Sequence, residues 1–179
     1  MEMRRAQQDM RRAYVGGAPG VLVSGLVWSV TGLIWLTEPL RIAFSALFVG
    51  GVLIFPLSVA ISRLVFRRAA AVKDNPLNRL GLESTFVLFA GIMISYVLLA
   101  RDPRFSIPAF ALVMGARYAA FATIYGNRLY WFLGGGVSAL GLIATLAPSV
   151  PPGNIALWIG GWELLLAAVM AASGARSAT

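Results

Sequence analysis

Two ionisable side chains lie near the middle of long apolar stretches, where they could bind a solute, an ion or a proton. Arg117 lies within Ile107–Gly126, and Glu163 lies within Ile155–Ala172. A charge at the centre of a bilayer costs about 2.5–3.5 kcal/mol on insertion scales, so it faces protein, water or a counter-charge rather than lipid. At 1.5 Å per residue, Arg117 would lie about 15 Å and Glu163 about 12 Å from one membrane boundary. We therefore expect the two side chains to meet inside a helical bundle.

An ion pair between Arg117 and Glu163 has two interpretations, and the sequence leaves both open. In the functional one, Arg117 binds an anionic group or holds a gate, and Glu163 is its counter-ion or a proton acceptor. In the structural one, the pair only fixes how two helices pack. The planar guanidinium offers five donors to a carboxylate, and Tyr118 or Tyr125 of the same span would satisfy the remaining groups. Because ionisable residues within a membrane often mark solute or proton pathways, function is the default hypothesis.

Three further side chains are candidates for a binding or gating site, each with a plainer alternative. Glu83 is a second acid near the inner end of its span, where it could join a proton relay. Arg79 lies four residues earlier and favours an ordinary i,i+4 ion pair instead. Trp28 and Thr31 share one helical face, which is typical of a stripe that turns inward or toward a cavity. The alternative puts the rings of that stripe in the interfacial belt and its hydroxyls on their own backbone.

The residue types that the chain lacks narrow the chemistry. The sequence has no His and no Cys, and its only Lys, Lys73, lies in a loop. An imidazole base, a thiolate nucleophile and the main ligands of haem and zinc are therefore missing. We expect no catalytic residue, no metal site and no cofactor. An intramembrane enzyme that uses Glu83 or Glu163 as an acid or base is the least favoured function.

The composition indicates that an all-α integral membrane bundle holds these residues. Of the 179 residues, 59% are hydrophobic and only 12% are charged, whereas soluble domains carry about 25% charged residues. A membrane-spanning helix needs about 20 apolar residues, so a chain of this length has room for six in a single domain, 15–179. The six spans are predicted at about 15–36, 41–62, 77–100, 107–126, 129–146 and 155–172.

Basic residues between the spans predict the orientation of the chain. Residues 1–14 are predicted to form a basic amphipathic helix in the headgroup region, and a frayed tail that serves only topology is the alternative. With the N-terminus inside, eleven Lys and Arg residues fall in inner segments, and only Arg41, Arg101 and Arg104 fall in outer ones. This bias places both termini in the cytoplasm. The net charge of +8 therefore serves orientation in a membrane, and we expect no nucleic-acid partner.

Two segments of the chain resemble each other. Residues 25–39 and 134–148 align without gaps and match at six positions, among them Gly25 with Gly134 and Gly32 with Gly141. The match suggests duplicated helical hairpins, and chance similarity between apolar segments is the alternative. Small residues at such positions allow helices in a membrane to pack closely.

Four stretches carry a resemblance to known proteins. They are RRAYVGGAPGVLVSGLVW (Arg11–Trp28), GGVLIFPLSV (Gly50–Val59), NPLNRLGLEST (Asn75–Thr85) and ARYAAFATIYGNRLYW (Ala116–Trp131). They resemble a group of small six-helix bacterial inner-membrane proteins of unknown function, over nearly the whole chain. The resemblance implies a bacterial source and a place in the inner (cytoplasmic) membrane, and it implies no chemistry.

The function that these observations favour is a small multi-pass transporter or channel-like protein for a small solute or ion. Its surroundings are the lipid bilayer, and a homo-oligomer is its candidate assembly. The alternative is a non-catalytic accessory or stress-related membrane protein that binds a partner or lipid through its Gly- and Ala-rich faces.

Overall fold

The computed structural model describes residues 2–147 and 154–176. Within these residues all regular structure is helical, and six helices are long and apolar enough to cross a membrane. The predicted all-α membrane bundle is thus confirmed, and the protein is a multi-pass membrane protein. The long helices are α2 (Ala18–Thr37), α3 (Leu40–Ala60), α4 (Pro76–Arg101), α5 (Ser106–Tyr125), α6 (Leu129–Leu146) and α7 (Ile155–Arg176). The short ones are α1 (Met3–Tyr14), η1 (Val15–Gly17), η2 (Ile61–Val65) and η3 (Pro103–Phe105).

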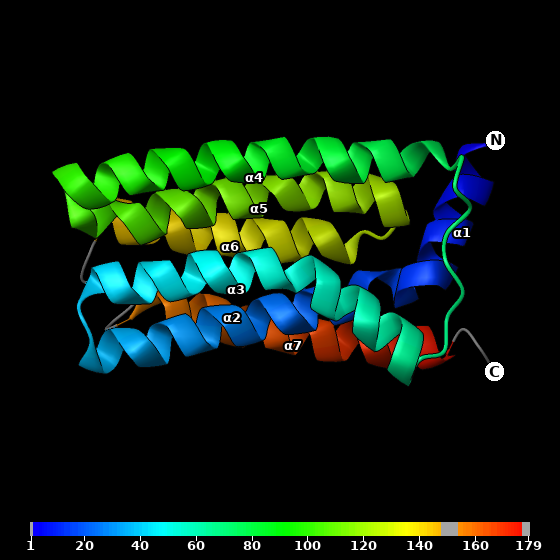
Figure 1. The fold of residues 1–179 in the computed structure, drawn as a ribbon, viewed down its shortest axis with the longest axis horizontal. Helices are drawn as coiled ribbons and strands as arrows, with labels where there is room; N and C mark the ends of the chain where they lie inside the picture. Colours follow the sequence, from blue (N-terminus) through cyan, green and yellow to red (C-terminus); the bar gives the residue numbers. More distant parts are fainter. Residues whose placement is uncertain (1, 148–153, 177–179) are drawn as a thin grey trace.

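The ends and bends of the helices follow from local sequence. The side chain of Asn75 caps α4 by accepting a hydrogen bond from the Leu77 amide at 3.0 Å, and Pro76 takes the first helical position, where its missing amide hydrogen costs nothing. Helix α5 ends at Gly126, whose φ of 56° is left-handed. Helix α3 contains Pro56 and passes into the π-helical turn η2, where it bends away from α4 (Figure 1).

The six long helices form a curved row that does not close into a ring. Their contacts give the order α4–α5–α6–α7–α2–α3, and the most extensive contacts join α5 with α6 and α2 with α7. Figure 1 shows α4, α5 and α6 above α3, α2 and α7. Helices α3 and α4, at the two ends of the row, have few contacts with each other. The bundle therefore has one open side, between α3 and α4.

Glycines allow the closest helix contacts. A Cβ atom at Gly115 of α5 would lie 2.6 Å from the backbone oxygen of Gly134 in α6. A Cβ atom at Gly160 of α7 would lie 2.8 Å from the amide nitrogen of Ser29 in α2 and 3.0 Å from the oxygen of Gly25. Gly25 and Gly134, which match in the two similar segments of the sequence, thus both lie at a tight helix contact.

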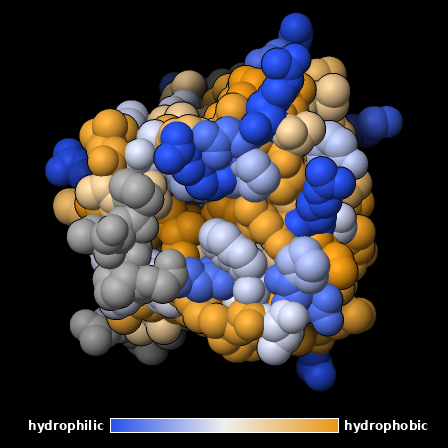
Figure 2. Space-filling model, turned by 90° about the vertical axis from the view of Figure 1, so that its left-hand side faces the viewer, coloured by the Kyte–Doolittle hydropathy of each residue, from blue (hydrophilic) through white to orange (hydrophobic). Residues whose placement is uncertain are grey.

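The two ends of the bundle differ. We call the end with α1 the inner end, after the orientation predicted from charge, and the opposite end the outer end. Helix α1 lies across the inner end, against α4 and α5, and residues 66–75 cross the same end between η2 and α4 (Figure 1). Hydrophilic side chains gather on the outer end (Figure 2). Glu38, Arg41, Arg101 and Arg104 are exposed there.

Candidate functional site

A cleft of about 720 Å³ occupies the open side of the bundle, between α2, α3, α4 and α5. Small-molecule pockets have volumes of about 300–1,000 Å³. Toward the inner end the cleft reaches Ser62, Asn78 and the exposed Lys73. Among the described residues that line it, Arg117 and Lys73 are the only charged ones. The cleft is therefore electropositive and suited to an anion.

Aromatic rings close the cleft on the outer side. The rings of Trp28 in α2 and Phe110 in α5, which both line the cleft, lie 5.9 Å apart. Phe44 of α3 lies 6.4 Å from Phe110 and 6.3 Å from Tyr96 of α4. These distances are typical of favourable ring contacts. All four helices around the cleft thus meet at this aromatic cluster.

Arg117 lies in the wall of the cleft and is held there by α4 and by its own helix. Its Nε donates a hydrogen bond to the backbone oxygen of Ser84 at 3.1 Å. Its Cζ lies 4.9 Å from the centroid of the Phe121 ring, one turn further along α5, in a cation–π contact. No described residue accepts a hydrogen bond from Nη1 or Nη2. The two terminal nitrogens of the guanidinium, with their four N–H donors, are therefore available to a ligand.

Glu163 lies behind the wall of the cleft and is fully buried. Its Oε1 accepts a hydrogen bond from the hydroxyl of Tyr118 at 2.6 Å, and the Ser24 hydroxyl lies 3.5 Å from that of Tyr118. Its Oε2 has no hydrogen-bond partner among the described residues. Tyr118 and Ser24 themselves line the cleft. The carboxyl group is thus one side chain away from the cleft.

The predicted ion pair between Arg117 and Glu163 is wrong. Each of the three ion pairs that the described residues form involves other side chains. Neighbouring positions on an α-helix are about 100° apart, so Tyr118 points toward α7 while Arg117 points toward α4 and the cleft. Adjacent residues of one helix therefore contact different partners. The depth of a residue in the membrane gives no information about the direction in which its side chain leaves the helix.

The remaining predicted site residues are divided between the cleft and other places. Trp28 is buried and lines the cleft, as does Tyr125 near its inner end. Thr31 is buried, lies outside the cleft lining, and its hydroxyl has no hydrogen-bond partner among the described residues. Glu83 forms an exposed ion pair with Arg79 at 2.8 Å, which is the plainer of its two interpretations. Glu83 is therefore not part of the cleft.

Sequence reasoning missed two aromatic residues of the site. Phe121 contacts Arg117, and Tyr130 of α6 stacks on Tyr125 with ring centroids 5.5 Å apart. Phe121 could have been found from spacing, because Arg117, Phe121 and Tyr125 follow each other at steps of four residues on one helical face. No local pattern indicates Tyr130, because its position under η1 depends on the tertiary fold. Its hydroxyl donates a hydrogen bond to the backbone oxygen of Gly16 at 3.0 Å.

We expect Glu163→Ala to destabilise the protein by about 1–3 kcal/mol, because the Tyr118 hydroxyl then lacks its acceptor and a fully buried site is left partly empty. Glu163→Gln keeps an acceptor oxygen and nearly the same volume, so its effect should stay below about 1 kcal/mol. Thermal unfolding of the purified variants in one detergent measures both. An equal loss for Gln and Ala would show that the ionised carboxylate, and not its hydrogen bond, stabilises the bundle.

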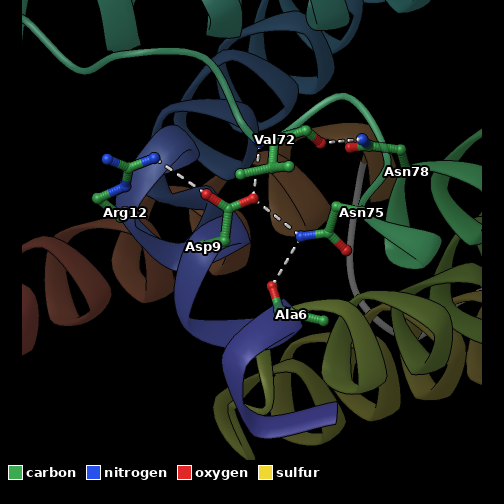
Figure 3. A network of polar contacts seen from close by, with 6 residues as sticks. All are labelled: Ala6, Asp9, Arg12, Val72, Asn75 and Asn78. Atoms are coloured by element: carbon green, nitrogen blue, oxygen red, sulfur yellow. Dashed lines mark hydrogen bonds and ion pairs between the residues drawn. The ribbon is translucent and has the colours of Figure 1, made fainter. Parts of the chain in front are cut away.

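Helix α1 is fastened at the inner end of the cleft by a network around Asp9 (Figure 3). The two oxygens of this carboxylate accept hydrogen bonds from Arg12 Nη2 at 3.0 Å, from the Val72 amide at 2.8 Å and from Asn75 Nδ2 at 2.9 Å. Asn75 also donates to the backbone oxygen of Ala6 at 3.0 Å. The loop before α4 is thereby tied to α1, whose Met10 and Tyr14 line the cleft.

Asp9 gives this network a pH dependence. Burial by itself raises the pKa of Asp9, but the hydrogen bonds from Asn75, Val72 and Arg12 outweigh it and hold the pKa below its usual value. The stabilisation by Asp9 is therefore complete when the pH is above about 3.9, the pKa of an Asp side chain in the unfolded chain. It is lost as the pH falls through the lower pKa of Asp9 in the folded protein. We expect Asp9→Asn to lower the stability by about 1–2 kcal/mol at neutral pH.

The measurement is the difference in Tm between the wild type and Asp9→Asn as a function of pH. This difference should be constant from about pH 5 to pH 8 and should shrink below about pH 4. Asp102→Asn is the control, because Asp102 pairs with Arg104 at a more exposed site. If the wild type and Asp9→Asn had the same Tm at neutral pH, Asp9 would not stabilise the position of α1.

Comparisons with known proteins identify a family and no activity. Among the described residues, no group of three or more His, Cys, Asp or Glu side chains could hold a metal ion. No curated protein and no solved structure matches the chain. The model of a family of unknown function, DUF7010, matches residues 3–173. Because this match covers nearly the whole chain, the protein belongs to the DUF7010 family of unknown function.

Proposed function

We propose that the protein is a transporter for an organic anion, which binds to Arg117 in the cleft. The observation that carries this proposal is a cleft of about 720 Å³ that reaches the guanidinium while Nη1 and Nη2 have no partner among the described residues. A guanidinium with two free donors on one edge matches a carboxylate, sulfonate or phosphate group. The lack of acidic side chains among the described lining residues favours an anion over a cation.

The shape of the cleft supports transport rather than simple conduction. The aromatic cluster of Trp28, Phe44, Tyr96 and Phe110 closes the outer side, and the exposed Lys73 lines the inner side. A site near the membrane midplane that is open to one side is what alternating access requires of one of its states. We propose that the inner end faces the cytoplasm, in agreement with the distribution of basic residues, and that the membrane is the inner membrane.

We propose Glu163 as a proton acceptor that responds to the occupancy of the cleft. Its carboxyl group is bonded to Tyr118, and Tyr118 lines the cleft beside Arg117. A ligand that displaces the Tyr118 hydroxyl would remove its hydrogen bond to Glu163. Glu163 thus keeps the role of proton acceptor that its sequence suggested, without a direct bond to Arg117.

Flux into proteoliposomes tests the proposal. Methanesulfonate and benzenesulfonate are suitable probes, because they stay charged and do not cross the lipid as neutral acids. We expect Arg117→Gln to slow their uptake at least tenfold, since it removes the cation that stabilises the anion at this depth. Arg117→Lys should keep part of the flux, and Arg79→Gln, which alters an exposed cation outside the cleft, should keep all of it. Wild-type flux equal to that of protein-free liposomes, or unchanged flux for Arg117→Gln, would refute transport.

One observation favours a second candidate function, a lipid-binding accessory protein. Phe55 of α3 and Phe89 of α4 line the cleft and are also exposed at the open side of the bundle. A cleft with an apolar side opening suits a protein that holds a lipid without moving it. Binding of a lipid with no flux of any anion would favour this candidate over transport.

A further inference from the structure

The open side of the bundle connects the cleft with the surrounding hydrocarbon. Four large apolar residues line the cleft and are nevertheless exposed at its edges: Val52 by 58% and Phe55 by 67% in α3, and Leu82 by 64% and Phe89 by 53% in α4. Because α3 and α4 have few contacts with each other, the cleft that both helices line opens to the outside between these side chains. On the flank of a membrane helix, the outside is lipid. A ligand can therefore enter sideways from the bilayer.

This side opening lies at the height of Arg117. From the inner end of α4, Leu82 is about 9 Å and Phe89 about 20 Å along the helix axis, at 1.5 Å per residue. Arg117 is about 12 Å from the inner end of α5 by the same measure. The guanidinium thus meets the cleft level with the opening, in the half of the membrane next to the inner end.

The cleft continues from Arg117 toward the outer side as an apolar channel. Phe110 lies two turns further out on α5, about 11 Å from Arg117 along the axis. Leu88 and Ile92 of α4 and Met114 of α5 line this part, and Phe110 with its neighbour Trp28 closes it. A charged group at one end and a closed apolar channel behind it match a molecule that has an anionic head and an alkyl chain.

We propose that the cleft binds a single-chain anionic amphiphile, taken up sideways from the membrane leaflet at the inner end. Its carboxylate or similar head group is bound by Arg117, and its chain extends to Trp28. This proposal rests on the proposed function, whose substrate class it names. The described contacts of the Arg117 guanidinium are the Ser84 oxygen and the Phe121 ring, so an anionic head group would supply the counter-charge that stabilises it at this depth. A single chain fits, because the volume of the cleft is that of a pocket for a drug-sized ligand.

Bromine quenching of Trp28 fluorescence tests the proposal in lipid nanodiscs. The probe is ω-bromoundecanoate, which carries its bromine at the end of the chain, and the neutral control is ω-bromoundecanol. Because the chain has five Trp residues, Trp28→Phe identifies the part of the quenching that comes from Trp28. We expect saturable quenching of Trp28 by the carboxylate, and only weak, non-saturable quenching by the alcohol, which partitions into the lipid without a counter-charge.

Two variants separate the head-group site from the chain site. Arg117→Gln should weaken saturable binding at least tenfold. Gly51→Leu should weaken it as well, because Gly51 lines the cleft and a Cβ there meets no atom within 4 Å, so a leucine would fill the cleft without disturbing helix contacts. Gly135→Leu is the matched control, since Gly135 has the same open surroundings but lies outside the cleft, and its binding should equal that of the wild type.

Four outcomes would overturn the amphiphile site. They are equal quenching by the acid and the alcohol, unchanged binding in Arg117→Gln, unchanged binding in Gly51→Leu, and saturable quenching only by a brominated two-chain anionic phospholipid. Because the binding measurement requires no transport, it separates the two proposals. Saturable quenching without sulfonate flux would keep the amphiphile site and refute the transport of small organic anions. Sulfonate flux without saturable quenching would keep that transport and refute the amphiphile site.

Discussion

We expect Gly115→Val to destabilise the protein by more than about 3 kcal/mol and to prevent assembly of the bundle at physiological temperature. A Cβ atom at this position would overlap the Ser138 hydroxyl, and it would lie 2.6 Å from the Gly134 oxygen and 2.7 Å from the Ser138 amide nitrogen. Two of these atoms belong to the backbone of α6, so no rotamer change can relieve the overlap. Overpacking of well-packed interiors costs about 1–3 kcal/mol, and the separation of two backbones costs more.

The matched control for this prediction is Gly135→Val in the facing helix α6. A Cβ atom at Gly135 meets no atom within 4 Å, so this variant carries the helix propensity of valine without an overlap. Thermal unfolding in detergent, together with the yield of monodisperse protein, measures both variants. If Gly115→Val and Gly135→Val were equally stable, α5 and α6 could move apart without a loss of stability. The contact at Gly115 would then not be essential for the assembly of the bundle.

We expect Gly17→Ala to destabilise the protein by about 3 kcal/mol or more, for two independent reasons. Gly17 has a φ of 84°, a conformation that costs an L-residue about 1–2 kcal/mol. In addition, a Cβ atom there would overlap the hydroxyl of Tyr130 and lie 2.6 Å from the ring of Tyr125. Since Tyr125 and Tyr130 are stacked on each other, the whole aromatic group at the inner end of the cleft would have to move.

Gly16→Ala separates the two contributions. Gly16 also has a positive φ, 62°, but a Cβ there meets no atom within 4 Å. We therefore expect Gly16→Ala to lose only the backbone part, about 1–2 kcal/mol. The measurement is thermal unfolding, supported by the near-ultraviolet circular dichroism of the stacked tyrosines. If the two variants were equally stable, the contact between η1 and the tyrosines would contribute nothing, and backbone strain would account for both.

The candidate site shows where sequence reasoning succeeds and where it ends. A charged residue within an apolar stretch can be recognised from the sequence, because transfer of a charge into hydrocarbon is unfavourable in any fold. Arg117 and Glu163 could therefore be singled out as unusual residues. Their partners could not, since partners depend on the direction in which each side chain leaves its helix. A single step along α5 separates Arg117, which contacts Ser84, from Tyr118, which contacts Glu163.

Helix ends and close helix contacts also follow from local sequence. Asn75 with Pro76 marks the start of α4, because capping needs only neighbouring residues. Small residues mark close contacts without naming the partner helix: Gly115 lies against α6, and Gly160 lies against α2. Which helices form each pair is decided by packing across the whole bundle, over sequence distances that no local pattern spans.

The sequence by itself determined that the chain is an all-α membrane protein with six apolar helices, since the length and hydropathy of each span depend on local composition alone. The tertiary structure decided that the row of helices stays open between α3 and α4, and that Arg117 faces this opening while Glu163 lies behind Tyr118. The physical reason is that hydropathy sets the depth of a residue in the membrane. Its direction around the helix axis, and hence its partners, depends on how all the helices pack together.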